Sequence, residues 1–362
     1  MAIRKALLSL LLSAIVLPAN FAFADGYDVL ELAAAPSEMA DKAPLFVVRK
    51  FGDRDYAAGD RGHIIFSDDG ENWTQANVPV RSTLLDVFFV NEQLGWAVGH
   101  EGVILHSNDG GQNWVLQYDG LRYGEEGLVY YEKLAAENPD NDLYPWMIGE
   151  MEFSIEQGAD KPFFGVIFYD EKHGHAAGAY GMFVRTEDGG ETWEHVLHNL
   201  ENDDFYHIFD FTPLPEPGRF FLVGEAGLLL VGDVNERDAD RVHSVPWEGS
   251  FFTAIDAEDG AVIMGGLRGR MFRTADEGLS WTVVEKPETS AIVALSKLPD
   301  GRLVAGGIAG EIMVSDDDGQ SFSMTPASFS VGPVFDFTPS GENLLIVAGP
   351  RGVQSASIAP IQ

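Results

Sequence analysis

A Gly-x-x-Gly pair, placed after a strand rich in small residues and before a second apolar strand, recurs seven times in this chain of 362 residues. The copies are Gly59/Gly62, Gly99/Gly102, Gly178/Gly181, Gly224/Gly227, Gly266/Gly269, Gly307/Gly310 and Gly349/Gly352. Successive copies lie 40, 79, 46, 42, 41 and 42 residues apart, so one interval contains an insertion of about 38 residues. An internal period of about 41 residues is typical of propellers and solenoids.

A second motif follows five of these pairs and mostly reads S/T-x-D-x-G-x-S/T/N-W. Its acidic and aromatic residues are Asp69 and Trp73, Asp109 and Trp114, Asp188 and Trp193, Asp276 and Trp281, and Asp317 and Phe322. We interpret this Asp box as a hairpin turn in which Asp accepts backbone N–H bonds, Gly takes a positive φ and the aromatic ring packs on its own sheet. A metal-binding loop is the alternative, but the alternation and the distal Glu of an EF-hand are absent.

Each unit also begins with an apolar strand, so one repeat supplies four strands. These first strands are expected at residues 83–90, 163–169, 206–212, 251–256, 291–297 and 331–338. Four short strands in each of seven units predict an all-β, seven-bladed β-propeller. The last unit ends after Ser357, before its outermost strand, and we expect residues 27–32 to supply that strand and close the ring.

The N-terminus has the pattern of an export signal. Arg4 and Lys5 precede an apolar run at residues 6–17, and Ala22 and Ala24 occupy the −3 and −1 positions of a cleavage site. This predicts a secretory signal peptide at residues 1–24, cleaved before Asp25, and a periplasmic protein consisting of one propeller domain at residues 25–362. No later apolar stretch is long enough to suggest membrane insertion of the mature chain.

Composition excludes several classes of partner and site. The chain carries 57 acidic against 23 basic residues, a formal charge of −34, which disfavours nucleic acid as a partner. It contains no cysteine, so disulfides and Cys-ligated metals are excluded. The histidine pairs His173/His175 and His195/His198 lack an evident third ligand, and we expect no metal and no cofactor.

The residues from Gly95 to Trp114 (GWAVGHEGVILHSNDGGQNW) combine both motifs, and those from His173 to Trp193 repeat them. This string resembles the photosystem II stability/assembly factor-like family of Asp-box (BNR) propellers. The resemblance implies a non-enzymatic propeller that helps a membrane protein complex to assemble and binds its client through an arginine patch on one face. The family includes members from non-photosynthetic bacteria, some of them encoded beside exporters of the resistance-nodulation-division type. We expect such a member here, acting as an adaptor that is monomeric by itself.

The third residue of each Gly-x-x-Gly marks one repeated place on a propeller rim. Around the ring it is Arg61, Glu101, Tyr180, Ala226, Arg268, Ala309 and Arg351. Because the seventh and first blades are neighbours in a closed ring, Arg351 is expected beside Arg61, and Arg81 lies either near them or on the opposite rim. Such arginines suit a carboxylate or an acidic peptide. The alternative is that each pairs with a nearby acid such as Asp60.

Acidic residues also recur in the first strands, at Asp86, Asp210, Asp256 and Asp336. They are expected to line the central channel, where they could bond backbone groups between blades, pair with the rim arginines or perform general acid–base catalysis. A sialidase-like, carbohydrate-active or carbohydrate-binding propeller is therefore the alternative function. The Arg-Ile-Pro string typical of sialidases is missing, because Arg49 is not followed by Ile-Pro. We therefore expect no catalysis.

The insertion, at about residues 119–162, is not explained by the repeat. Residues 125–137 predict a short amphipathic helix with Leu128, Tyr131, Leu134 and Ala135 on one face, and the rest reads as irregular, acidic sequence. A long insertion in a compact fold either covers the scaffold or contacts a partner. Its aromatic and Met content favours a contact surface.

Overall fold

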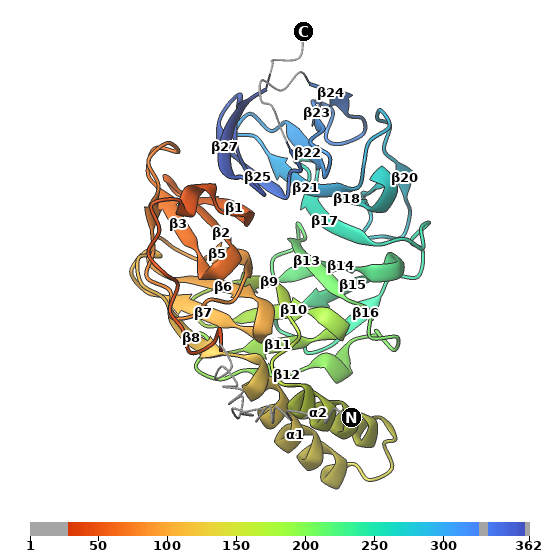
Figure 1. Cartoon of the computed structure of the whole chain (residues 1–362). Coiled ribbons are helices and arrows are strands. Elements are labelled where there is room, and N and C mark those ends of the chain that lie inside the picture. Colours follow the sequence, from red (N-terminus) through yellow and green to blue (C-terminus); the bar gives the residue numbers. More distant parts are fainter. Residues whose placement is uncertain (1–27, 326–331, 359–362) are drawn as a thin grey trace, which may run out of the picture.

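The structure, a computed structural model, describes residues 28–325 and 332–358. In this part of the chain seven antiparallel sheets follow one another around a central axis (Figure 1). The predicted signal peptide and the predicted cleavage site before Asp25 lie outside the described residues. No helix within the described ranges has the length and apolar character needed to cross a bilayer.

Blades one to four each have four strands in sequential order. Blade one contains β1 (Leu45–Phe51), β2 (Arg54–Gly59), β3 (Ile64–Ser67) and β4 (Thr74–Gln75). Blade two contains β5 (Leu84–Phe89), β6 (Gly95–Gly99), β7 (Ile104–Ser107) and β8 (Val115–Tyr118). Blade three contains β9 (Phe163–Phe168), β10 (Gly174–Gly178), β11 (Phe183–Thr186) and β12 (Glu194–His195). Blade four contains β13 (Ile208–Pro213), β14 (Arg219–Gly224), β15 (Leu229–Asp233) and β16 (Ala239–Arg241).

The remaining blades continue the order. Blade five contains β17 (Phe251–Asp256), β18 (Val262–Gly266), β19 (Met271–Thr274) and β20 (Thr282–Val283). Blade six contains β21 (Ile292–Lys297), β22 (Leu303–Gly307), β23 (Ile312–Ser315) and β24 (Ser323–Met324). Blade seven has three described strands, β25 (Asp336–Gly341), β26 (Leu344–Gly349) and β27 (Gly352–Ser357). The predicted seven-bladed propeller is confirmed.

The expectation that residues 27–32 complete blade seven is wrong for the described residues of that segment. Asp28 Oδ1 accepts the N–H of Leu30 at 2.9 Å, which bends the chain into a turn where the alternating pattern suggested a strand. Leu30 then packs between blades one and two, and the carbonyl of Val29 accepts the N–H of Arg81 at 2.8 Å. Residue 27 itself lies outside the described residues.

Side-chain packing joins blades seven and one. Leu45 and Val48 of β1 share a buried cluster with Ile346 and Ala348 of β26. On the outer side, the turn η1 (Ala40–Lys42) contacts β27. Within the described ranges, the ring therefore closes through side-chain packing and no N-terminal strand joins blade seven.

The strand order fixes two rims. Turns between second and third strands emerge on the same side as the connections between blades, and we call this side the Gly-x-x-Gly rim. Turns between first and second strands emerge on the opposite side with the Asp boxes, and we call that side the box rim. The five clearest Gly-x-x-Gly turns are η2 (Asp60–Gly62), η3 (His100–Gly102), η4 (Ala179–Gly181), η6 (Glu225–Gly227) and η7 (Leu267–Gly269).

The Asp boxes form the predicted turns. In blade two, Asp109 Oδ1 accepts the backbone N–H groups of Gln112 and Asn113 at 3.0 and 2.9 Å and the Ser107 hydroxyl at 2.9 Å. Gly110 and Gly111 adopt φ of 73° and 80°, and Trp114 is buried. The other four boxes repeat the Asp-to-hydroxyl bond, at 3.0, 2.8, 2.9 and 2.7 Å. The boxes are structural.

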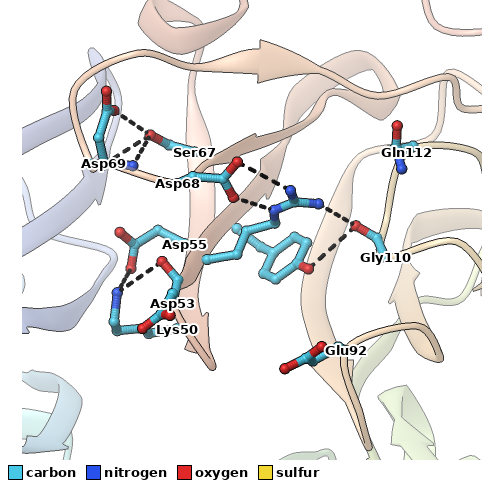
Figure 2. Close-up of polar contacts among 12 residues, drawn as sticks. Lys50, Asp53, Asp55, Ser67, Asp68, Asp69, Glu92, Gly110 and Gln112 are labelled. Atoms are coloured by element: carbon cyan, nitrogen blue, oxygen red, sulfur yellow. Dashed lines mark hydrogen bonds and ion pairs between the residues drawn. The ribbon is translucent and has the colours of Figure 1, made fainter.

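Neighbouring boxes are also linked (Figure 2). Arg54 Nε donates to Asp68 Oδ1 of the first box at 2.6 Å, and its Nη1 donates to the carbonyl of Gly110 in the second box at 3.2 Å. The hydroxyl of Tyr56 donates to the same carbonyl at 3.3 Å. These bonds join the first two boxes through the carbonyl of Gly110.

Replacing a box Asp should destabilise the propeller. Asp317 accepts the Ser315 hydroxyl, and both the N–H and hydroxyl of Ser321, at 2.7, 2.9 and 2.6 Å. Loss of these bonds in Asp317→Ala should lower the free energy of unfolding by about 2 kcal/mol. Asp316→Ala is the matched control, because that side chain is exposed. Urea denaturation that finds equal losses for the two variants would contradict the assignment.

The insertion forms a helical hairpin rather than one helix and a loop. Helix α1 (Gly120–Glu137) starts earlier than predicted because Asp119 Oδ1 accepts the N–H groups of Leu121 and Arg122, both at 3.0 Å. Helix α2 (Leu143–Gln157) was not predicted. Pro145 lies in its first turn, where no N–H donor is needed, and Met147, Met151 and Ser154 form its buried face. The hairpin extends from one edge of the ring (Figure 1).

Candidate partner-binding face

The Gly-x-x-Gly turns hold their third residue in a strained conformation and present it to solvent. Five of the seven positions have positive φ values: Arg61, Glu101, Tyr180, Ala226 and Arg268, between 51° and 57°. Only Gly adopts this region without cost, so the backbone conformation does not explain why these turns carry residues other than Gly. Arg61, Tyr180, Arg268 and Arg351 are all exposed.

The arginines occupy separate parts of this rim. Arg61 and Arg81 line one hollow of about 670 Å³ together with His100 and Glu101, which places Arg81 on the Gly-x-x-Gly rim. Arg61 Nε lies 3.5 Å from Asp60 Oδ2, and Arg81 Nε donates to the carbonyl of Ala33 at 2.8 Å. The acid-pairing interpretation thus holds for Arg61 in the free protein.

The expected pairing of Arg351 with Arg61 is not seen among the described residues. Arg351 lines a different and smaller hollow with Gly332 and Pro333, and no contact between Arg351 and Arg61 is recorded among the described residues. The turn η1 (Ala40–Lys42) enters between their blades, because a Cβ on Gly352 would lie 1.8 Å from the carbonyl oxygen of Asp41. The described residues thus show no contact that would make Arg351 and Arg61 one arginine pair.

The central channel contains an ion cluster in which the half-exposed Arg49 pairs with two largely buried carboxylates. Its guanidinium donates to Asp86 Oδ1 at 3.2 Å and to Asp336 Oδ2, so it joins blades one, two and seven. Burial would lower the pKa of Arg49, but Asp336, Asp86 and Asp210 together raise it above its usual value. Arg49 is therefore charged, and no local motif in the sequence predicts its pairing with Asp86 and Asp336.

Three of the four predicted channel acids bond backbone groups between blades. Asp86 accepts the N–H of Val166 at 3.2 Å, Asp210 that of Ala254 at 3.2 Å, and Asp336 that of Val48 at 2.9 Å. In each case the donor belongs to another blade's first strand. The structural role considered for these carboxylates is thus confirmed for these three.

Asp256 was wrongly placed among the channel acids. Asp86 and Asp210 are the third residues of their strands, whereas Asp256 ends β17, and Thr253 takes the third position there. Asp256 instead forms an ion pair with Lys297, whose Nζ lies 2.8 Å from Asp256 Oδ2. The described contacts also include no ion pair between any of the four acids and the rim arginines Arg61, Arg268 or Arg351.

Asp210 differs from its two partners. Among the described residues it has no ion pair within 4 Å, although it lines the same channel cavity of about 350 Å³. Burial raises the pKa of Asp210 to about 7, and the attraction of Arg49 opposes this rise only in part. Asp210 is therefore only partly ionised at neutral pH.

A β-bulge near the start of the first strand repeats in six blades. The register shifts between Leu84 and Asp86, between Ile208 and Asp210, and at the equivalent places of β1, β9, β17 and β21. A bulge leaves its extra residue unpaired and redirects its side chain. The residues at this place and its counterpart in blade seven line the channel: Phe46, Leu85, Phe164, Phe209, Phe252, Val293 and Phe335.

These seven residues form an apolar ring at the channel mouth. First strands start at the Gly-x-x-Gly rim, so the ring opens on that rim. All seven side chains are partly exposed. The sequence marks these channel-lining residues. At this place each blade has two consecutive apolar residues (LF, LL, FF, IF, FF, IV and VF), whereas a strictly alternating strand would have a single apolar residue there, and our sequence interpretation missed this pattern.

The helical hairpin adds to the same rim, because it replaces the connection between blades two and three. Tyr131 of α1 is fully buried and contacts the rings of His195 and His198, with centroids 6.0 and 5.5 Å away. Gly127 permits this approach, since a Cβ there would lie 2.7 Å from the His195 ring. His195 is therefore a packing residue under the hairpin, and His175 is buried as predicted. No group of three potential metal ligands occurs within the described ranges.

The buried histidines predict how stability depends on pH. Burial lowers the pKa of His175 to about 3, against 6.5 in the unfolded chain, so below pH 6.5 protons bind preferentially to the unfolded chain. The contribution of His175 is fully present above pH 6.5 and decreases as the pH falls towards 3. His175→Phe, which fits the stacking position on Phe183, should therefore gain stability relative to wild type by up to about 1.4 kcal/mol per pH unit below 6.5. Melting curves at pH 7.5 and 5 test this, and a constant difference would contradict it.

A family model described as Photosynthesis system II assembly factor YCF48 matches residues 65–153 and 139–322. These matches cover more than half of the chain. The chain belongs to this family. The resemblance seen in the repeated motifs is thus confirmed.

Curated relatives in the YCF48 family align with parts of the chain. The photosystem II stability/assembly factor HCF136 of Guillardia theta is 35% identical over 69 residues, which is 18% of each chain. The photosystem II assembly protein Ycf48 of Thermosynechococcus vestitus is 23% identical over 184 residues, 48% of this chain and 53% of the relative. The chain therefore spans about half the length of this relative, and less of the first.

Solved structures support the fold over nearly the whole chain. A structure titled YCF48 bound to D1 peptide has a TM-score of 0.61 at 14% identity and covers 88% of this chain and 95% of its own. YCF48 from Cyanidioschyzon merolae has the same TM-score at 15% identity, covering 89% and 97%. The WD40 propeller domain of Doa1 has a TM-score of 0.59 at 9% identity, covering 92% and 97%. At these identities the similarity establishes the propeller and no shared binding residue.

Proposed function

We propose that this member of the YCF48 family is a non-enzymatic assembly or adaptor protein that binds a membrane protein complex through its Gly-x-x-Gly rim. The observation that supports this most is the contrast between the two rims. The box rim has polar groups bonded within and between its turns. The Gly-x-x-Gly rim gathers exposed arginines, the aromatic channel mouth and the helical hairpin.

The hairpin surface has the apolar character of a contact site. Val129 of α1 is 68% exposed and Phe153 of α2 is 50% exposed, and Leu121, Leu143, Trp146 and Ile155 are also exposed. Clustered exposed apolar residues mark interaction sites in soluble proteins. The relatives named photosystem II assembly proteins, and the YCF48 structure with a D1 peptide, support a membrane protein as the client class.

Three parts of the proposal rest on the sequence and on its family resemblance: the compartment, the oligomeric state and the type of client. We place the mature protein, a monomer by itself, in the periplasm after removal of residues 1–24. The client is a complex that exposes a periplasmic segment, and an exporter of the resistance-nodulation-division type is one candidate. The carbohydrate-active alternative gains no support, because Asp86, Asp210 and Asp336 accept backbone bonds and two of them also pair with Arg49.

Affinity capture tests this function. The tagged mature protein is purified from native membranes as wild type and as the double variant Arg61→Glu/Arg351→Glu, and co-purifying proteins are identified by mass spectrometry. We expect one membrane complex with wild type and at least a tenfold lower yield with the double variant. Lys172→Glu is the control, because Lys172 is exposed on the box rim. Recovery of no membrane protein by wild type would reject the proposal.

A further inference from the structure

A row of aromatic rings runs across the Gly-x-x-Gly rim from the channel mouth towards the hairpin. The ring centroids of Phe252 and Phe209 are 5.5 Å apart, and those of Phe209 and Phe164 are 5.4 Å apart. Phe164 is followed by His207 at 6.1 Å, and His207 by Tyr180 at 4.8 Å. Consecutive contacts of this kind make one surface and not isolated exposed rings.

The row continues onto α2 through a shared cavity. Tyr180 and Trp146 both line a hollow of about 230 Å³ between α2 and the turn η4, floored by Met151, Met182 and Leu197. Trp146 stacks on Phe205 with a centroid distance of 4.2 Å. We call Phe252, Phe209, Phe164, His207, Tyr180 and Trp146 the aromatic track.

The track is exposed although its rings are large. Tyr180 is 59% exposed and Trp146 is 43% exposed, and the three phenylalanines are partly exposed. The packing of the propeller does not require Tyr180 to be aromatic, because its turn holds it at φ 53° and directs it to solvent. Exposed aromatic rings of this kind bury large areas at low entropy cost when a partner binds.

The charges beside the track are mainly acidic. Asp210, without an ion-pair partner among the described residues, lies next to Phe209 in the channel lining. Glu150 lines the α2 end of the track, and Glu225 Oε2 lies 3.9 Å from His207 Nε2. Two basic groups lie near the track among the described residues. Lys161 donates to the Ser154 hydroxyl at 2.6 Å and is largely buried, and Arg49 in the channel lining is already paired with Asp86 and Asp336. Phenyl faces beside a carboxylate favour a cationic group, because cation–π and ionic attraction add.

We propose that the aromatic track binds an extended segment of the client polypeptide that carries large apolar side chains and one basic side chain, with the basic group in the channel mouth near Asp210. The ring distances from Phe252 through Phe209 and His207 to Tyr180 limit this part of the track to about 16 Å, which is about five residues of extended chain at roughly 3.3 Å each. This inference rests on the proposed function for the origin of the segment. It adds the chemistry of the segment and its place on the rim.

Binding of labelled peptides to the full mature chain tests the inference. The probes are three fluorescent nonapeptides: one alternating Phe and Ala with a central Arg, one with Glu in place of Arg, and one with Ser in place of every Phe. By fluorescence polarisation, we expect the Phe/Arg peptide to bind at least about tenfold tighter than either of the others. Equal binding of all three, or no measurable binding, would overturn the proposal.

Variants locate the binding site. Trp146→Ser and Tyr180→Gly should each weaken the Phe/Arg peptide at least about fivefold, and Tyr180→Gly also relieves the positive φ and so protects folding. Val129→Ser is the control, because Val129 is exposed on α1 outside the track. Unchanged affinity in both track variants would overturn the proposal, even if the peptide binds elsewhere.

The same variants separate this inference from the proposed function. Capture of a membrane complex that Arg61→Glu/Arg351→Glu abolishes, but Trp146→Ser and Tyr180→Gly leave intact, would keep the function and reject the track. Failure of wild type to capture any membrane protein, with selective peptide binding preserved, would reject the membrane client and keep the peptide site.

Discussion

Arg49→Met should lower the free energy of unfolding by about 2–3 kcal/mol at pH 7.5. The substitution leaves Asp86 and Asp336 in the channel without their counter-charge, and removing one partner of a buried pair typically costs about 3–5 kcal/mol. The Arg49 side chain keeps 44% of its surface exposed to the channel, so solvent screening reduces the expected loss. Urea denaturation measures it.

Two comparisons make the Arg49 prediction specific. Adding Asp336→Asn to Arg49→Met should recover part of the loss, because Asn still accepts the Val48 N–H without a buried charge. Burial raises the pKa of Asp86 and Asp336, so the cost of Arg49→Met should also shrink as the pH falls and these carboxyls become neutral. Arg61→Met, on the exposed rim, should stay within about 0.5 kcal/mol of wild type. An Arg49→Met variant as stable as Arg61→Met would contradict the role of Arg49 in joining blades one, two and seven.

Tyr131→Ala should detach the helical hairpin while the propeller stays folded. Tyr131 is fully buried between α1 and blade three, and truncation of a buried aromatic side chain costs about 3–5 kcal/mol. The hairpin packs on blade three through a cluster with Tyr123, Met147 and Met151. The free energy lost in Tyr131→Ala should therefore weaken the contact between the hairpin and blade three. Limited proteolysis should cut within residues 120–158 at least about tenfold faster than in wild type.

The hairpin variant also has a matched control. Val129→Ala changes the same helix at an exposed position and should leave the cleavage rate unchanged. If Tyr131→Ala instead unfolds the whole chain in one transition, the hairpin is part of the propeller's folding unit and not an attached element. Equal cleavage of wild type and Tyr131→Ala would show that Tyr131 does not anchor the hairpin.

Repeated local signals made the fold predictable. The Gly-x-x-Gly turn and the Asp box each depend on a few neighbouring residues, such as Ser107, Asp109 and Gly111, whose bonds form within the turn itself. Their spacing then fixed the number of blades. The packing role of His175 followed from its alignment with Trp96 in the preceding blade, and both side chains are buried.

Features that depend on distant contacts were missed. Asp256 looked equivalent to Asp210, but only an acid directly after the bulge reaches the next blade. The sequence marks that place by two consecutive apolar residues, and our sequence interpretation missed this mark. Arg49 pairs with residues 37 and 287 positions away. The apolar and polar residues of helix α2 do not separate into two clear faces in the sequence, and the helix contains a proline. Its buried face is recognisable only from its packing on blade three.

The most direct test of the central claim, that the Gly-x-x-Gly rim is the client face, is photo-crosslinking in living cells. p-Benzoylphenylalanine replaces Tyr180 or Arg268 on that rim, and Leu279, which is 82% exposed in the Asp box of blade five, serves as the position on the opposite rim. Mass spectrometry then identifies the crosslinked proteins. We expect an integral membrane protein to be crosslinked from positions 180 and 268 and not from 279. Crosslinks to such a protein from position 279, with none from 180 or 268, would contradict it.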